Sequence, residues 1–153
     1  MLKTQHIVLS ALLVFLSAFA ISGESASEPA LALSMKDKQL QWGPCPSFIP
    51  KGCQIAVLHG DPSRENSDIY FKVPGGFTIP EHWHTSAERM VLVSGKLDLT
   101  YQGQKTKTLK AGMYAYGPAK AHHKAVCANG PACILFIAFE GPVDAMPAAA
   151  DKP

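Results

Sequence analysis

The sequence predicts an all-β fold, built as a single barrel or sandwich of short strands. Residues 68–73 and 97–101 alternate apolar with polar side chains, as half-buried strands do. Clusters of glycine, proline, asparagine and serine separate such segments, and no long segment shows the 3.6-residue period of an amphipathic helix. Because short strands with regular turns are typical of sandwiches and barrels, we expect one domain of that kind.

The first 27 residues are expected to lie outside the fold. Lys3 precedes a largely apolar, uncharged run over residues 7–21, and small residues follow it, which is typical of a cleavable secretory signal peptide. Residues 18–20 and 25–27 are both candidate cleavage sites. A retained anchor is the alternative, although this run is short for a membrane span of about 20 residues. We therefore expect a periplasmic or secreted protein that meets a membrane only through this segment.

The remaining chain has the size of one compact domain. Its formal net charge stays at +2, because residues 1–27 contain one lysine and one glutamate. Lys105, Lys107 and Lys110 alternate with uncharged polar residues, which indicates the solvated face of a strand. The charge pattern therefore predicts no nucleic-acid partner.

The strands are expected in a simple order. A mostly apolar strand over residues 54–58 ends at the turn-forming cluster of residues 59–63. The half-buried strand of residues 68–73 follows, and residues 74–76 turn the chain into the most informative stretch, described below. An apolar run over residues 90–93 predicts the next strand.

The later elements follow the same reasoning. Leu97, Leu99 and Tyr101 share one face of their strand, and a turn at residues 102–103 ends it. Residues 134–139 are apolar on both faces, which predicts a central strand. We thus expect an N-terminal extension over residues 28–53, a barrel over residues 54–140 and a flexible, proline-containing tail over residues 141–153.

The stretch from residue 76 to residue 95 holds two histidines in a His-x-His pattern. If this stretch is a strand, His82 and His84 project from one face, roughly 7 Å apart, which suits two ligands of one metal ion. Glu88 keeps the same parity, but a fully extended chain would carry it roughly 13 Å beyond His84. The chain must therefore turn back at residues 85–87, where serine and threonine favour a turn.

Two blocks of this chain resemble motifs of the cupin superfamily. The first matches the cupin pattern G-x5-H-x-H-x3-E-x6-G at all defined positions, which are Gly76, His82, His84, Glu88 and Gly95. The second matches in part, with Gly112, Pro118 and His123 in register. Lys120 stands where the family usually has glycine, and Cys127 where it usually has asparagine. The resemblance covers roughly residues 54 to 140.

The resemblance implies a small jelly-roll barrel that binds one divalent transition metal. The implied ligands are His82, His84, Glu88 and His123, with His122 beside them. Such nitrogen- and oxygen-rich sets suit iron, manganese, nickel, copper or zinc and leave the choice among them open. Cupins also often pair through edge strands, so a homodimer is a family expectation.

Four cysteines in an exported chain predict disulfides. Three connectivities exist, and we favour Cys45 with Cys53 and Cys127 with Cys133, because each pair closes a short loop. The second bond would then clamp a hairpin whose turn contains an Asn-Gly pair. A zinc site is the alternative, but neither pair has the spacing that zinc sites favour.

Several aromatic residues are candidates for the wall of a metal pocket. Tyr114 and Tyr116 share one parity, so both or neither face inward. Facing inward, they would be candidate catalytic residues beside Glu88, and facing outward they would pack on the barrel's surface. Phe77 and Met90 are further wall candidates, whereas the parity of Trp83 favours a place outside the pocket.

The leading functional hypothesis is a metal-dependent enzyme acting on a small organic molecule. Similarity to cupin dioxygenases implies oxygen-dependent cleavage of an enolic or phenolic substrate, with Glu88 as metal ligand and proton acceptor. Decarboxylation and isomerisation on the same scaffold are close alternatives. The alternative from another class is a non-catalytic module that binds a small ligand or a metal, and a purely structural barrel is the third hypothesis.

Overall fold

The computed structural model describes residues 28–148, which form eleven strands and contain no helix. Within this range no helix is therefore long or apolar enough to cross a membrane. The described chain divides between residues 32 and 33, and every strand lies after that division. The expected signal peptide lies outside the described residues. The strands are β1 (Trp42–Pro44), β2 (Gln54–His59), β3 (Ser67–Val73), β4 (Thr78–Trp83), β5 (Glu88–Ser94), β6 (Lys96–Tyr101), β7 (Lys107–Lys110), β8 (Tyr114–Gly117), β9 (His123–Cys127), β10 (Cys133–Phe139) and β11 (Met146–Pro147).

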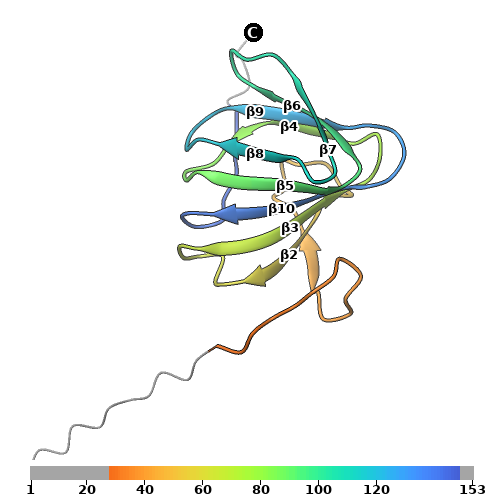
Figure 1. Cartoon of the computed structure of the whole chain (residues 1–153). Helices are drawn as coiled ribbons and strands as arrows, with labels where there is room; N and C mark the ends of the chain where they lie inside the picture. The colour runs from red at the N-terminus through yellow and green to blue at the C-terminus, as the bar shows by residue number, and fades with distance from the viewer. Residues whose placement is uncertain (1–27, 149–153) are drawn as a thin grey trace, which may run out of the picture. The chain divides into compact units, whose positions relative to one another are not determined.

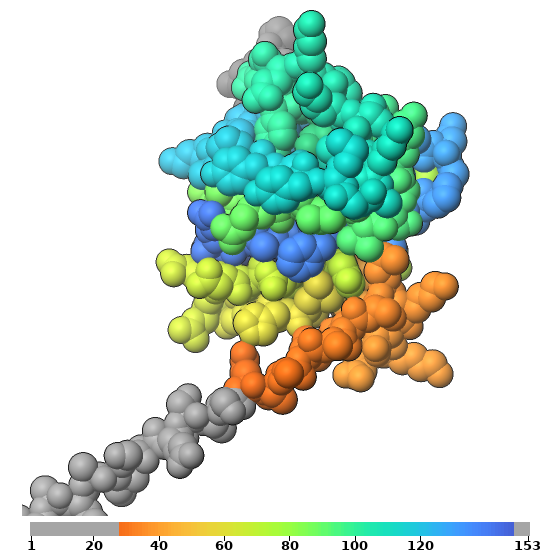
Figure 2. Space-filling view, in the orientation of Figure 1, coloured from red at the N-terminus to blue at the C-terminus, as the bar shows by residue number. Residues whose placement is uncertain are grey.

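The strands form two antiparallel sheets (Figure 1). One has six strands in the order β1-β2-β3-β10-β5-β8, and the other has five in the order β11-β4-β9-β6-β7. Buried residues from both sheets form one apolar cluster between them. Figure 2 shows the side chains that cover the surface over β2, β3, β10, β5 and β8. The expected all-β jelly-roll barrel is thus confirmed.

Strand periodicity decides which side chains enter this core. In β3 and β10 every second residue is buried, and the residues between them are half-buried on the outer face. The prediction of a central strand at residues 134–139 is confirmed, because β10 lies between β3 and β5. Its outward apolar side chains are half-buried beside the side chains of β3 and β5.

Both expected disulfides are present, but the hairpin expected around Cys127–Cys133 is not. Cys127 ends β9 in the five-stranded sheet, whereas Cys133 begins β10 in the six-stranded sheet. The prediction was wrong because β4 and β6 already occupy both edges of β9, which leaves no edge for β10. The disulfide therefore links the two sheets.

The flexible tail expected from residue 141 is a second correction. The amide of Val143 donates to the carbonyl of Pro62 (2.8 Å), and that of Ala148 donates to the carbonyl of Glu81 (3.0 Å). Between these contacts, β11 pairs with the open edge of β4. A proline is compatible with such an edge strand, because an edge strand has one side without ladder bonds. Residues 149–153 lie outside the described part.

The segment before the expected barrel also contributes to the sheet. β1 pairs with β2, so that it forms one edge of the six-stranded sheet. The Cys45–Cys53 disulfide then closes the loop between these two strands. Three residues are too few for a periodic pattern, which is why the sequence did not indicate β1.

Candidate metal centre

β4 and β9 bring three histidines together. His82 lies near the end of β4, directly opposite His123 at the start of β9, and His84 follows β4 by one residue. The chain then crosses to the other sheet, where Glu88 is the first residue of β5. The turn back required between His84 and Glu88 is therefore a crossing between the two sheets.

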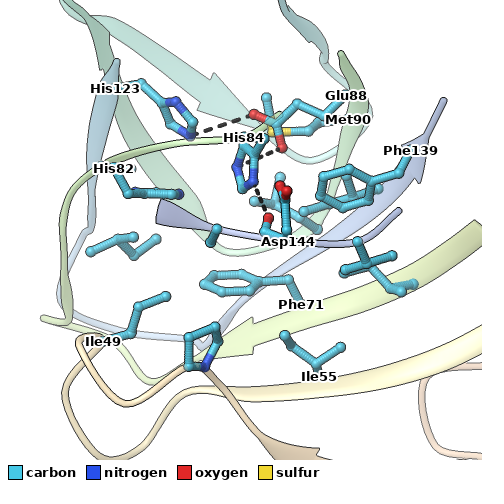
Figure 3. A pocket seen from close by; sticks show the side chains of 18 of the residues that line it. Ile49, Ile55, Phe71, His82, His84, Glu88, Met90, His123, Phe139 and Asp144 are labelled. Atoms are coloured by element: carbon cyan, nitrogen blue, oxygen red, sulfur yellow. Dashed lines mark hydrogen bonds and ion pairs between the residues drawn. The ribbon is translucent and has the colours of Figure 1, made fainter. Parts of the chain in front are cut away.

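The three imidazoles form a compact, buried cluster. One ring nitrogen from each of His82, His84 and His123 can be chosen so that all lie within 4.8 Å of one another. Glu88 is 2% exposed, and its Oε2 lies 3.5 Å from Nε2 of His84 while its Oε1 lies 3.4 Å from Nε2 of His123. Figure 3 shows this carboxylate facing both rings. The four side chains predicted from the two motif blocks thus lie together.

Backbone carbonyls fix the orientation of all three rings. Nδ1–H of His82 donates to the carbonyl of Pro80 (2.8 Å), and that of His123 donates to the carbonyl of Ala121 (3.0 Å). Nδ1–H of His84 donates to the carbonyl of Asp144. A carbonyl can only accept, so each neutral ring carries its proton on Nδ1 and keeps a lone pair on Nε2. Three such lone pairs form a donor set that suits a transition metal ion.

Burial sets the charge of these groups in the metal-free protein. It lowers the pKa of His82 to about 4 and that of His123 to about 3, because the imidazolium form loses its hydration. Burial also raises the pKa of Glu88, whereas the neighbouring His84 and a hydrogen bond from Tyr101 act in the opposite direction. His82 and His123 are therefore neutral near pH 7, which is the form that binds metals.

Tyr101 contacts the cluster, although the sequence analysis gave it no role at the site. Its hydroxyl donates to Oε1 of Glu88 at 3.5 Å, and its ring centroid lies 5.0 Å from that of His123. The register explains the contact, because Tyr101 of β6 pairs with His123 of β9. Its shared parity with the buried Leu97 and Leu99 was the available signal.

Tyr114 and Tyr116 are not part of the site. Tyr114 is 58% exposed and Tyr116 is 51% exposed. In the register between β8 and β5, they lie opposite Val91 and Arg89. The opposite parity of β8 faces inward, where Gly117 approaches Glu88. The expectation that these tyrosines are catalytic is therefore corrected in favour of its alternative, a place on the outer surface.

The turn before His123 depends on Lys120. This residue has a φ of +62°, the conformation that glycine adopts without strain, at the position where the cupin motif usually has glycine. The amide of Ala121 donates to the carbonyl of Pro118 (3.1 Å), and the amide of Lys120 donates to the carbonyl of His84 (2.8 Å). The second motif block is thus tied directly to the first.

His122 points away from the cluster. Its Nδ1 lies 3.7 Å from Oε1 of Glu81, and its ring stacks on Trp83 with 6.3 Å between centroids. Neither His122 nor Trp83 lines the cavity described below. Trp83 therefore lies outside the pocket, as its parity predicted.

Asp144 is a further residue that sequence reasoning missed. Besides its carbonyl contact with His84, its Oδ1 accepts from the amide of Thr85 (2.9 Å) and its Oδ2 from the Thr85 hydroxyl (2.5 Å). The segment after β10 therefore holds the turn that follows His84. No periodic signal marks this residue, since it lies outside the strands.

The cluster occupies one end of a cavity of about 140 Å³ between the sheets. Both sheets contribute apolar side chains to the wall, and Pro46 and Ile49 of the disulfide loop contribute as well. Met90 lines the cavity as expected, whereas Phe77 packs against the apolar core instead. The arrangement combines a polar, ligand-rich end with a hydrocarbon-lined body.

Comparison with known proteins gives one family and many structural neighbours. Residues 32–144 match the family described as "ChrR Cupin-like domain". No curated protein sequence matches the chain. The family match includes part of the segment that the sequence analysis treated as an extension.

Three similar structures illustrate the range of the neighbours. The DMSP lyase DddQ from Ruegeria pomeroyi has a TM-score of 0.62 at 15% identity, with 74% of this chain and 64% of that chain covered. An acetylacetone dioxygenase from Acinetobacter johnsonii has a TM-score of 0.57 at 21% identity, with 75% of each chain covered. A structure of Rhodobacter sphaeroides SigE in complex with the anti-sigma ChrR has a TM-score of 0.54 at 22% identity, with 69% of this chain and 50% of that chain covered. The chain thus spans less than two thirds of the DMSP lyase, and at these identities the likeness shows the fold alone.

Proposed function

The chain belongs to the ChrR cupin-like family, and on that premise we propose that it is an exported, metal-dependent enzyme acting on a small organic molecule. The favoured chemistry is oxygen-dependent cleavage of an enolic or phenolic substrate. The observation that carries the proposal is the cluster of three oriented imidazoles and a buried carboxylate at one end of an apolar cavity. A closed structural metal site would have no use for such a cavity beside it.

The proposed metal ligands are Nε2 of His82, His84 and His123, with the carboxylate of Glu88 as the fourth. Their chemistry fits a divalent transition metal, because each Nδ1 is already engaged and each Nε2 keeps its lone pair. When bound, such a metal supplies Lewis acidity toward a substrate oxygen and, if redox-active, electrons for oxygen chemistry. Iron, manganese, nickel, copper and zinc all remain compatible with this set.

The chain's own groups would handle the proton and the water. Glu88 is the proposed acceptor for the proton of an enol or phenol, because its carboxylate lies within the cluster that would face such a group. Tyr101 would hold the carboxylate in place through its hydroxyl. The apolar wall would keep water away from a reactive intermediate.

Elemental analysis and oxygen uptake test this function. Protein purified without chelators should contain one transition metal per chain and should consume oxygen with at least one member of a 1,3-diketone, enediol and catechol series. His82→Ala should lose both the metal and the uptake, whereas Tyr114→Phe on the outer surface should keep both. A metal-free wild type that stays metal-free after supplementation would contradict the proposal.

A second candidate is a non-catalytic module that binds a small ligand or a metal and acts through a partner. The family match and the similarity to a structure of an anti-sigma complex favour it. Bound metal without turnover of any compound in the series would support this candidate over the enzyme.

Export is proposed from the N-terminal sequence together with the two disulfides, which are typical of oxidising compartments. Fractionation of producing cells, followed by N-terminal sequencing of the mature protein, tests it. A chain that starts at residue 1 in the reducing cytoplasm would contradict it.

A further inference from the structure

The cavity wall is mostly apolar. Twenty residues line it, and fifteen of them are apolar. Within residues 28–148 no lysine, arginine, hydroxyl or amide side chain lines the cavity. The five polar lining residues are His82, His84, Glu88, His123 and Asp144.

None of these polar side chains offers a hydrogen-bond partner to a ligand atom that lies away from the cluster. The histidines and Glu88 form the cluster itself, and both carboxylate oxygens of Asp144 are engaged by Thr85. Figure 3 shows His123 and Glu88 at one end, with Phe71 and Ile55 away from them. A ligand can therefore find polar partners only at the cluster end.

The size of the cavity limits the ligand further. Its volume of about 140 Å³ is close to that of an apolar engineered cavity of about 150 Å³ that binds benzene. A ligand of roughly that size reaches from the cluster to the apolar end. Any polar group on its far side would lose its hydration without gaining a partner.

Resting on the proposed function, we propose that the substrate is a small molecule whose polar atoms all lie at one end, with a hydrocarbon body about as large as a benzene ring. The oxygens at the polar end face the metal cluster, and the body contacts residues such as Phe71, Ile137 and Leu99. Sugars, zwitterions and molecules with a carboxylate far from the coordinating oxygens are excluded as substrates. The wall, rather than the metal, makes this selection.

Matched ligand pairs test the inference by binding, without turnover. In protein loaded with Zn(II), which has no redox chemistry, 4-methylcatechol and 3,4-dihydroxybenzoate present the same coordinating oxygens and differ only in the distal group. Calorimetry should give at least about tenfold tighter binding of 4-methylcatechol, because the distal carboxylate is buried unpaired. Equal affinities, or tighter binding of the carboxylate, would overturn the inference.

A second pair tests the wall in metal-free protein. The compounds p-cresol and hydroquinone have similar size, but hydroquinone carries a second hydroxyl at the far end. Shifts of the Met90 methyl resonance should show weaker binding of hydroquinone by about tenfold, and equal binding would contradict the inference. This arm needs no metal, so it decides the question even if the proposed function fails.

A positive charge introduced at the far end of the cavity should reduce the affinity ratio of 4-methylcatechol to 3,4-dihydroxybenzoate. Ile55 lines the cavity from β2 and is only half-buried, so Ile55→Lys can hold its ammonium near solvent. The variant should favour 3,4-dihydroxybenzoate relative to wild type, and Ile55→Leu should leave the ratio unchanged. An unaltered ratio in Ile55→Lys would count against the inference. Oxygen uptake with a substrate that carries a distal carboxylate would overturn this inference alone. The expected affinity ratios without any oxygen uptake would overturn the proposed oxygen-dependent chemistry alone.

Discussion

At the scale of single residues, the position of Glu88 depends on a glycine. A Cβ added at Gly117 would lie 2.5 Å from the Tyr101 hydroxyl and 2.7 Å from Oε1 of Glu88. Both distances are far below van der Waals contact, so the hydroxyl and the carboxylate occupy the space that any other residue would fill. The tyrosine and the carboxylate can meet only because this residue lacks a side chain.

Gly117→Ala should therefore weaken metal binding by about tenfold or more, since one coordinating group is displaced while the three imidazoles remain. Competition with a chromophoric chelator measures the affinity. Gly43→Ala is the matched control, because the nearest atom to its added Cβ is 4.0 Å away. Equal metal affinity in the two variants would show that Glu88 is not a ligand.

The hydroxyl of Tyr101 should influence the pH dependence of metal binding. Burial raises the pKa of Glu88 above its usual value, and the hydrogen bond from Tyr101 lowers it. A metal must displace any proton on this carboxylate, so affinity in the wild type should rise with pH as the carboxylate loses its proton. Tyr101→Phe removes the lowering contribution, and the midpoint of metal uptake should move to higher pH.

Tyr114→Phe, on the exposed face, should leave that midpoint unchanged. A midpoint that is the same in all three proteins would mean that the Tyr101 hydroxyl does not act on Glu88. Parallel titrations of metal uptake between pH 4 and pH 8 provide the comparison.

Lys120 holds a backbone conformation that costs free energy. A non-glycine residue in the left-handed region costs about 1–3 kcal/mol of folding free energy, and a glycine there would remove that strain. Glycine would also lose more backbone entropy on folding, which costs about 0.5–1 kcal/mol. Lys120→Gly should thus stabilise the protein by up to about 2 kcal/mol in urea unfolding. Lys124→Gly, within β9, should destabilise it by about 0.5–1 kcal/mol. Destabilisation by both changes would refute this account of Lys120.

Residue spacing predicted some of the site and missed the rest for physical reasons. Local spacing and parity indicated His82 and His84, whereas Glu88 and His123 were indicated by the resemblance to the two cupin motif blocks. Tyr101 and Asp144 act on that block from other segments, and such contacts depend on sheet register and chain path, which periodicity does not encode.

At the scale of elements, the link between β9 and β10 has two roles. Cys127 and Cys133 are almost fully buried, and their bond joins the two sheets four residues beyond His123. A bridge that closes so short a loop contributes about 2 kcal/mol by constraining the unfolded chain. It also fixes the end of the strand that carries His123, a proposed metal ligand.

The double variant Cys127→Ala, Cys133→Ala should accordingly lose about 2–3 kcal/mol of unfolding free energy and some metal affinity. Denaturant unfolding and chelator competition measure the two effects. Cys45→Ala, Cys53→Ala provides the comparison, because that bond closes a loop of similar length that contributes Pro46 and Ile49 to the cavity instead. If the two double variants have the same metal affinity, the sheet link does not help to position His123.

Strand patterns indicated most elements but not their partners. Alternation found β3 and β6, whereas the Asn-Gly turn suggested a hairpin that the sheets exclude. A turn signal is local, and the pairing of a strand depends on which edges remain free. The short edge strands β1 and β11 are too short to show an alternating pattern. They are strands because they pair with β2 and β4.

At the scale of the whole molecule, the proposed metal ligands come from both sheets. His82 and His123 belong to the five-stranded sheet, whereas Glu88 belongs to the six-stranded sheet. An ion held by all of these groups would bind the folded state more tightly than the unfolded chain, in which His123 has no fixed position relative to the other three. Metal binding must then stabilise the entire fold through mass action.

Removal of the metal should therefore lower the unfolding temperature in proportion to metal affinity. At a free metal concentration of 100 times Kd the stabilisation is about 2.7 kcal/mol, which for a chain of this size corresponds to about 10 °C. Calorimetry of chelator-treated and reconstituted protein measures the difference. His122→Ala should keep the full shift, because His122 faces away from the cluster, whereas His123→Ala should abolish it. A shift that survives in His123→Ala would place the stabilising ion at another site.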